Sequence, residues 1–440
     1  MEKYPTPNIR PLKWAIWLYF WLLLFEGVLR KWIFPEWSDV LFIIRDPLVV
    51  IIYLLAVRLG MFPQRLAVLA VGLLAVVSLA FTLANDSLFV VTLFGLRTNY
   101  LHVPLVFVMA QTLDRDDVLR FGRWVLLMSV PIILLMWQQF EAEPDHWLNA
   151  GVSGTTMGQL RGAMGRIRPP GPFSFIGGVV AYFALVAAFV FNGWLQQGTF
   201  PRLLVWVATV AVAAAVPLSV SRSVLFALLV VAMFGLAVAA RDLRRVRAYL
   251  GPLVASAAVL GLAADSIYME AFRTRWEESI SAGSGDFSTN VVGRIIGEFT
   301  QPFELAAGAP LFGHGIGVGT IAGARLSTGK HEFILAESEL ARIVLELGPV
   351  LGFAFIAWRV WLAATMVWSG WRKYLGTGDP LSWLLAGSCF LAVLVGQWGP
   401  ATQLGFAVFG AGLTLAAQND PPGDAGEMQA AEEEEASADS

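Results

Sequence analysis

Arginines at the borders of apolar runs are the residues of this chain best suited to chemistry. Arg168 lies in RPPGPFSF, with Arg166 two residues before it; Arg222 lies in SVSRSV and Arg294 in NVVGRIIGEF. A guanidinium carries a planar fork of N–H donors that matches two phosphate oxygens. Several such groups converging at a membrane surface would bind a diphosphate. The same arginines are also compatible with snorkelling, or with salt bridges to the glutamates at positions 141, 143, 277 and 278.

Proton acceptors and glycines form a second group of candidates in the C-terminal third of the chain. Imidazole and carboxylate groups are common general bases, and glycine lets the backbone approach a ligand closely. A tight turn, a helix-surface ion pair and a helix cap at Glu337 are plainer interpretations of the same residues. Glu346 lies inside an apolar run and therefore requires a polar partner or cavity. The candidates for a base or for substrate contacts are Gly313, His314, Gly315, Glu337, Glu339 and Arg342.

Charged residues also occur within the apolar runs, where an unpartnered charge is costly. Glu26 precedes Arg30 by four residues and Arg45 adjoins Asp46, so both pairs look structural. Arg97, in LFGLRTNYLHVPLVF, has no obvious acidic partner nearby in the sequence. We therefore expect Arg97 to line the same cavity as the arginines near the long loops, as a substrate-binding residue.

The composition places these residues in a membrane protein. Of 440 residues, 57% are hydrophobic and only 14% are charged, so a soluble protein of this composition could not cover its surface with polar side chains. This excludes an ordinary soluble enzyme, a disordered chain and a nucleic-acid-binding protein. Twelve apolar segments are predicted to cross the membrane as α-helices. They are 13–29, 39–57, 66–84, 87–111, 118–138, 173–195, 203–219, 223–240, 248–268, 340–367, 381–398 and 401–417.

The basic residues predict how these spans are oriented. With the N-terminus in the cytoplasm, cytoplasmic segments carry fifteen Lys and Arg residues and short outer turns carry three. Cytoplasmic loops are enriched in such residues, so both termini are predicted to be cytoplasmic. Segments 139–172 and 269–339 then form long outer loops, with helical stretches at 266–280 and 290–306. Residues 418–440 hold eight acidic and no basic residues, which predicts a disordered cytoplasmic tail after a membrane domain at 1–417.

Familiar catalytic and metal-binding motifs are absent from the sequence. It contains no Walker loop, no HExxH and no GxSxG, and its one cysteine, Cys389, lies in an apolar run. The acidic cluster from Asp114 to Asp117 opens a predicted helix on the cytoplasmic side, where carboxylates suit the helix dipole. We interpret this cluster as a helix start, and the sequence predicts neither a metal site nor a cofactor.

Several short motifs, taken in order, resemble those of the O-antigen ligase and Wzy-type polymerase superfamily. The resemblance covers most of the membrane region and is strongest from about 160 to 353. One departure concerns the slot where many members carry His-Asn, which here holds Glu337 and Ser338. The marks that carry the resemblance are Arg168 before a Pro/Gly-Phe turn, Ser219, Ser221 and Arg222 at a helix start, Arg294 in the large loop, Pro310 to Gly315, and Glu346-Leu347-Gly348.

The resemblance implies an all-α polytopic protein of the bacterial inner membrane, with about twelve spans and a large, partly helical outer loop. It implies a metal-independent glycosyltransferase whose donor is a glycan on undecaprenyl diphosphate and whose acceptor is another glycan. Arg168, Arg222 and Arg294 would clamp the diphosphate, and Glu337 or His314 would be the base. The missing family histidine favours a polymerase of exopolysaccharide or O-antigen units over a ligase, and other polysaccharide-assembly membrane proteins would be partners.

Two other functions compete with this interpretation. A transporter or flippase of lipid-linked glycan would also carry twelve spans and cations that bind a diphosphate. It would, however, distribute its charges through the middle of the membrane and have short outer loops. A noncatalytic membrane component of a polysaccharide export complex is the other alternative, with the acidic tail as its docking segment.

Overall fold

The computed structural model describes residues 8–84, 88–152, 161–281, 287–329 and 334–420. These residues form helices joined by turns and short loops, and the strand-like pairing among them is one bridge between Arg161 and Ile167. The all-α fold predicted from the apolar segments is therefore confirmed. The side chain of Arg294 and the acidic tail from 421 onward lie outside the described residues.

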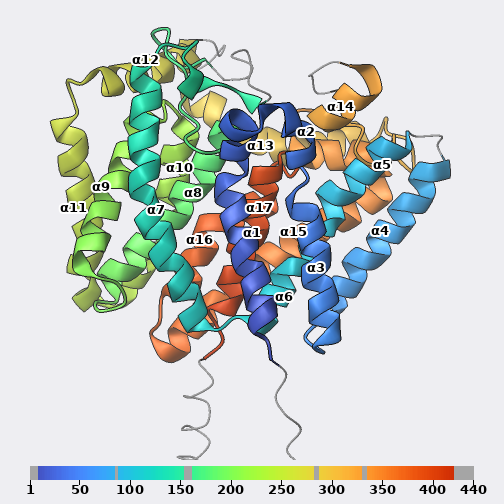
Figure 1. Ribbon diagram of the computed structural model, residues 1–440, viewed down its shortest axis with the longest axis horizontal. Helices are drawn as coiled ribbons and strands as arrows, with labels where there is room; N and C mark the ends of the chain where they lie inside the picture. Colours follow the sequence, from blue (N-terminus) through green and yellow to red (C-terminus); the bar gives the residue numbers. More distant parts are fainter. Residues whose placement is uncertain (1–7, 85–87, 153–160, 282–286, 330–333, 421–440) are drawn as a thin grey trace, which may run out of the picture.

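Helices of very different length make up the bundle (Figure 1). Two of them continue into single π-helical turns, at Leu29–Ile33 after α1 and at Arg97–Leu101 between α5 and α6. The α-helices are α1 (Arg10–Val28), α2 (Ser38–Leu41), α3 (Arg45–Arg58), α4 (Leu66–Ala84), α5 (Phe89–Leu96), α6 (Val103–Thr112), α7 (Arg115–Glu141), α8 (Ile176–Leu195), α9 (Arg202–Leu218), α10 (Arg222–Arg241), α11 (Val246–Leu262), α12 (Ile267–Ser281), α13 (Phe287–Ala306), α14 (Ile321–Thr328), α15 (Glu339–Thr377), α16 (Leu381–Leu394) and α17 (Ala401–Ala416).

Each of the twelve predicted spans falls on a helix or on a broken helix. Within the described residues, eight helical segments are long and apolar enough to cross a membrane, and nine if α11 and α12 count as one bent span. The remaining apolar helices, α9, α16 and α17, have 17, 14 and 16 residues. The chain is therefore a polytopic membrane protein by the length and composition of its helices.

The predicted span 248–268 is wrong at its C-terminal end. Helix α11 ends at Leu262, and the chain turns by 98° before α12 begins at Ile267. The turn holds Asp265, which we had placed inside the span. In the turn, Ser266 caps α12, because its Oγ accepts a hydrogen bond from the backbone N–H of Met269 at 3.4 Å. A polar residue followed by a capping serine marks a helix boundary. Here the apolar residues on both sides make the sequence look like one continuous span.

Both ends of the described chain lie at the same end of the bundle (Figure 1). Lys13 near the N-terminus lies 3.3 Å from Asp114, and the Asn419 amide near the C-terminus donates to the backbone oxygens of Ala110 and Leu113. Asp114 forms a capping box with Asp117 at the start of α7, which confirms that this cluster is a helix start.

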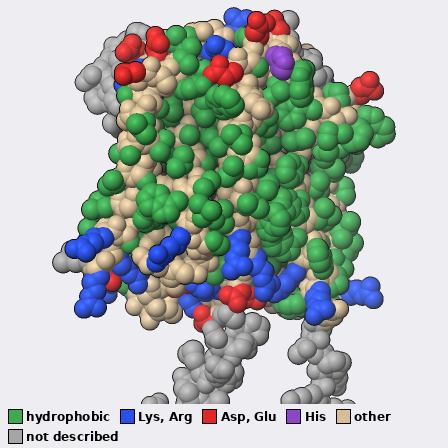
Figure 2. Space-filling model, turned by 60° about the vertical axis from the view of Figure 1, so that its left-hand side comes forward, with side chains coloured by type: hydrophobic (Ala, Val, Ile, Leu, Met, Phe, Trp, Pro, Cys, Tyr) green, Lys and Arg blue, Asp and Glu red, His purple; other side chains and the backbone are tan. Residues whose placement is uncertain are grey.

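The surface of the bundle is divided into zones. On the face that Figure 2 shows, apolar side chains cover the middle, Lys and Arg gather at the end where both termini leave, and Asp and Glu lie mainly at the opposite end. The opposite end carries α12, α13 and α14 (Figure 1). The helical stretches predicted at 266–280 and 290–306 are confirmed as α12 and α13.

Two exposed arginines lie at opposite ends of the bundle, and cysteines in their places can test whether the bundle spans the membrane. Arg65 borders the same crevice as Lys13 and Asn419, at the end with the termini, whereas Arg325 lies on α14 at the other end. We expect that single cysteines at these two positions react differently with a membrane-impermeant maleimide in intact cells. Only one should be labelled before permeabilisation and both afterwards; Cys389 is buried and serves as the unlabelled background. Labelling of both in intact cells would contradict a membrane-spanning bundle.

Candidate functional site

The turn that follows Arg168 is anchored by buried polar groups of two helices. At the end of α1, the Lys31 ammonium donates to the backbone oxygens of Gly171 at 2.7 Å and Phe173 at 2.9 Å. From α7, the side-chain amide of Gln139 donates to the backbone oxygen of Gly171 and accepts from the backbone N–H of Gly171. Gly27 allows the close approach of α1, because a Cβ there would lie 2.3 Å from the Pro172 oxygen. The RPPGPFSF turn is therefore held rigidly, and with it the position of Arg168.

Three arginines from separate segments meet near this turn. Arg168 comes from the loop, Arg222 is the first residue of α10, and Arg275 lies on α12. Helix α12 reaches across the start of α10, where Trp276 lies 6.1 Å from Phe226 between ring centroids. Burial lowers the pKa of Arg168 from its ordinary value, and the positive charges of Arg275 and Arg222 lower it further. Arg168 is thus near enough to both Arg222 and Arg275 for their positive charges to act on it.

Part of the hydrogen-bonding capacity of this arginine cluster is unused within the described residues. The Nε–H groups of Arg168 and Arg275 are both buried, and neither has a hydrogen-bond partner there. Arg275 does pair with Glu278, at 3.0 Å. Buried N–H donors without a partner cost free energy, and clustered positive charge adds to that cost. An anionic group between Arg168 and Arg275 would supply acceptors and relieve the repulsion.

The Ser-x-Ser-Arg turn beside the cluster has a strained backbone. Val220 has a φ of +46°, which is unfavourable for a β-branched residue, and its side chain is fully buried. Ser219 stabilises the preceding helix end by donating to the Val216 oxygen at 3.0 Å. Such strain costs on the order of 1–3 kcal/mol and is concentrated at functional sites. The turn brings Arg222 to the N-terminus of α10, where the helix dipole also favours an anion.

The glycine segment does not lie in an open loop but packs against a break in α15. Gly348 interrupts that helix with a φ of +77°. The backbone N–H groups of His314 and Gly315 donate to the oxygens of Leu345 and Glu346, at 2.9 and 3.0 Å. A Cβ on Gly313 would lie 2.2 Å from the Glu346 oxygen. Close backbone packing therefore accounts for Gly313, and substrate binding by Gly313 and Gly315 stays a prediction.

A buried ion network lies beside this break. Arg342 contacts Glu339 at 2.8 Å, Glu346 at 2.6 Å and the side-chain oxygen of Asn99 at 3.1 Å. Arg359 joins the network through Glu339, at 3.1 Å. Glu346 thus has the partner that its position in an apolar run requires. Glu339 and Arg342 are both buried within these pairs, so their observed contacts are structural, and contact with a substrate stays a prediction.

One expectation about charges within the apolar runs is corrected, and Arg97 gains a partner; substrate binding by Arg97 stays a prediction. Arg45 does not pair with Asp46; it contacts Glu26 at 3.1 Å, and Glu26 also binds Arg30 at 3.1 Å as expected. Asp46 binds Arg97 at 2.6 Å, so Arg97 has an acidic partner that is distant in sequence. Adjacent residues on a helix point about 100° apart, which is why Arg45 and Asp46 find partners on different helices.

The remaining predicted residues are Arg166, His314, Glu337 and Arg294. Arg166 donates to the backbone oxygens of Phe140 and Glu141, and His314 and Glu337 are exposed. Glu337 does not cap α15, as we had considered; Ser338 does, by accepting from the Ala341 N–H. Arg294 lies on α13, but its side chain is outside the described residues.

Sequence reasoning missed two residues that the structure brings to these sites. Arg275 was not among the predicted residues, and the fold that brings it near Arg168 leaves no local signal in the sequence. Glu298 on α13 accepts from the backbone N–H groups of Glu339 and Leu340, at 3.1 and 3.4 Å, and so supports the start of α15.

Comparison of the whole sequence with models of known protein families and with curated proteins finds no match.

The packing at Gly348 predicts that this position tolerates no side chain. A Cβ there would lie 2.1 Å from the Leu311 oxygen, in addition to the positive φ. We expect Gly348→Ala to lower the free energy of unfolding by at least about 2 kcal/mol, measured as thermal unfolding in detergent. Gly376→Ala in the same helix is the control, because no atom lies within 4 Å of its Cβ. Equal stability of the two variants would contradict the close packing.

Proposed function

We propose that the protein is a membrane glycosyltransferase of the O-antigen ligase and polymerase type, acting on glycans carried by undecaprenyl diphosphate. The observation that carries the proposal is the proximity of Arg222 and Arg275 to Arg168, together with the buried Nε–H groups of Arg168 and Arg275 that lack partners among the described residues. A diphosphate would supply acceptors and negative charge at once. The resemblance in motif order, stated above, adds the substrate class.

In the proposed reaction an acceptor sugar hydroxyl attacks the anomeric carbon of the donor glycan. The new C–O bond forms as the bond from that carbon to the diphosphate oxygen breaks, and undecaprenyl diphosphate leaves with the bonding electrons. The hydroxyl proton passes to a base, for which Glu337 and His314 are the candidates. Negative charge grows on the diphosphate, and fixed guanidinium groups stabilise such charge without a metal. Arg294 completes the proposed clamp.

We further propose that all twelve apolar helical segments cross the bacterial inner membrane and that both termini are cytoplasmic. The short helices α16 and α17 are consistent with this, because they are largely buried among other helices and need not match the lipid thickness themselves. The arginine cluster, the segments 139–172 and 269–339, and the acceptor would then lie on the outer side. The basic end with the termini would face the cytoplasm.

A transporter of lipid-linked glycan is the second candidate. The observation that favours it is the buried charge in broken helices, at the π-helical turn containing Arg97 and at the break in α15. Transporters use such discontinuous helices near the membrane midplane. In these segments, however, Arg97, Glu339, Arg342 and Glu346 bind one another or other protein groups, which favours a structural role.

Substitution of Arg275 tests the proposed site without relying on the motif resemblance. We expect Arg275→Ala, like Arg168→Ala and Arg222→Ala, to lower the yield of long surface glycan by about 10²-fold, the usual effect of removing a donor from a site of developing charge. The assay is glycan length in a deletion strain of the native host complemented at matched protein levels. Arg325→Ala is the control, since its exposed pair with Asp39 lies on α14.

The leaflet on which lipid-linked glycan accumulates separates the candidate functions. Single repeat units on the outer leaflet identify a polymerase, and long lipid-linked chains there identify a ligase. Accumulation on the inner leaflet would replace the transferase by the transporter. Normal glycan in all three arginine variants, together with its loss in the deletion strain, would indicate a noncatalytic component.

A further inference from the structure

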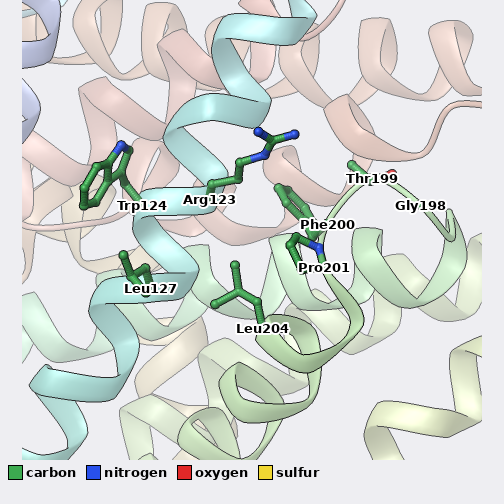
Figure 3. A pocket seen from close by; sticks show the side chains of 8 residues that line it. All are labelled: Arg123, Trp124, Leu127, Gly198, Thr199, Phe200, Pro201 and Leu204. Atoms are coloured by element: carbon green, nitrogen blue, oxygen red, sulfur yellow. The ribbon is translucent and has the colours of Figure 1, made fainter.

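A crevice at the basic end of the bundle is distinct from the arginine cluster. It has a volume of about 660 Å³ and lies between α7 and the loop that connects α8 to α9. Figure 3 shows Arg123 extending from α7 towards this loop, with Phe200 and Pro201 opposite it. Trp124 and Leu127 border the crevice and are 41% and 45% exposed, so it opens onto apolar surface.

The depth of Arg123 is unusual for an exposed cation. It is the ninth residue of α7, so about 12 Å of helix separates it from the helix start. Arg123 therefore lies inside a helical segment that is long and apolar enough to cross a membrane. An arginine at this depth must reach the interface or bind an anion.

Arg123 forms no hydrogen bond or ion pair with the residues that the structure describes, whereas several neighbouring cations do. Lys13 lies 3.3 Å from Asp114, Arg115 lies 2.5 Å from Asp379, and Arg120 lies 2.9 Å from Asp117. The eight residues that line the crevice include no carboxylate. A phosphate would therefore meet a free guanidinium, and a positively charged headgroup would meet no partner.

We propose that this crevice binds one anionic phospholipid of the leaflet at the basic end. The phosphodiester accepts hydrogen bonds from the Arg123 guanidinium, and the first part of an acyl chain lies along Leu127, Phe200 and Leu204. Gly198, with a φ of +92° and no atom within 4 Å of its Cβ position, leaves the loop side of the crevice open to the headgroup. An anionic lipid fits better than a zwitterionic one, because only the latter brings an ammonium group to a basic surface.

The test uses the purified full-length protein in detergent, titrated with phosphatidylglycerol, with phosphatidylcholine or with soluble glycerol phosphate. We expect phosphatidylglycerol to raise the melting temperature, and the other two to have little effect. Arg123→Gln should raise the half-saturating concentration of phosphatidylglycerol at least about tenfold, because a charge-assisted pair is lost. Arg58→Gln, an exposed arginine at the end of α3, should leave it unchanged.

A second variant separates the crevice from general surface charge. Leu204→Trp fills the apolar side and keeps Arg123, so it should also abolish the stabilisation by phosphatidylglycerol. Stabilisation by phosphatidylcholine equal to that by phosphatidylglycerol would overturn the proposal, as would an unchanged response in Arg123→Gln. An equal effect of glycerol phosphate would identify a soluble-phosphate site and would overturn it too.

Discussion

The ion pairs of Arg342 with Glu339 and Glu346 form a buried network within α15 that also binds parts of the chain distant in sequence. Arg342 also donates to Asn99 in the π-helical turn, and Glu346 accepts from the Gly319 N–H at 2.8 Å. All of these groups are buried, so none can turn to water if a partner is lost. Breaking a buried pair of this kind costs about 3–5 kcal/mol, which makes the network a condition for the packing around α15.

The arginine cluster near the 168–175 turn, unlike the α15 network, has more basic than acidic side chains. In the α15 network two acidic and two basic side chains compensate each other. Around Arg168, by contrast, Arg222 and Arg275 lower its pKa, and Glu278 is the acidic residue that raises it. The surrounding structure fixes this arrangement, because Lys31 and Gln139 hold the turn from two helices. The excess of positive charge around Arg168, with the unpartnered Nε–H groups of Arg168 and Arg275 among the described residues, favours an anion there.

The sequence predicted the helices well because the apolar segments and their basic flanks are local signals. It missed the break between α11 and α12, where one serine and one aspartate set the boundary inside an apolar run. It also placed Arg168 and Arg222 beside turns, as the structure has them, but it gave no sign that Arg275 would lie near Arg168, because that proximity depends on how α12 folds back. The partners of Arg45 and Arg97 were unpredictable for the same reason, since they lie on other helices.

The electrostatics of the cluster also bear on how the proposed reaction would be driven. A diphosphate that links lipid and glycan carries less negative charge than the diphosphate that leaves, because the broken bond places its electrons on a phosphate oxygen. An Arg168 that is repelled by Arg222 and Arg275 would therefore gain more from the leaving group than from the intact donor. Binding that strengthens as charge develops lowers the barrier, whereas equal binding of both states does not. In the proposed reaction, the repulsion around Arg168 would thus favour the transition state over the intact donor, and the rigid turn would maintain that repulsion before the substrate binds.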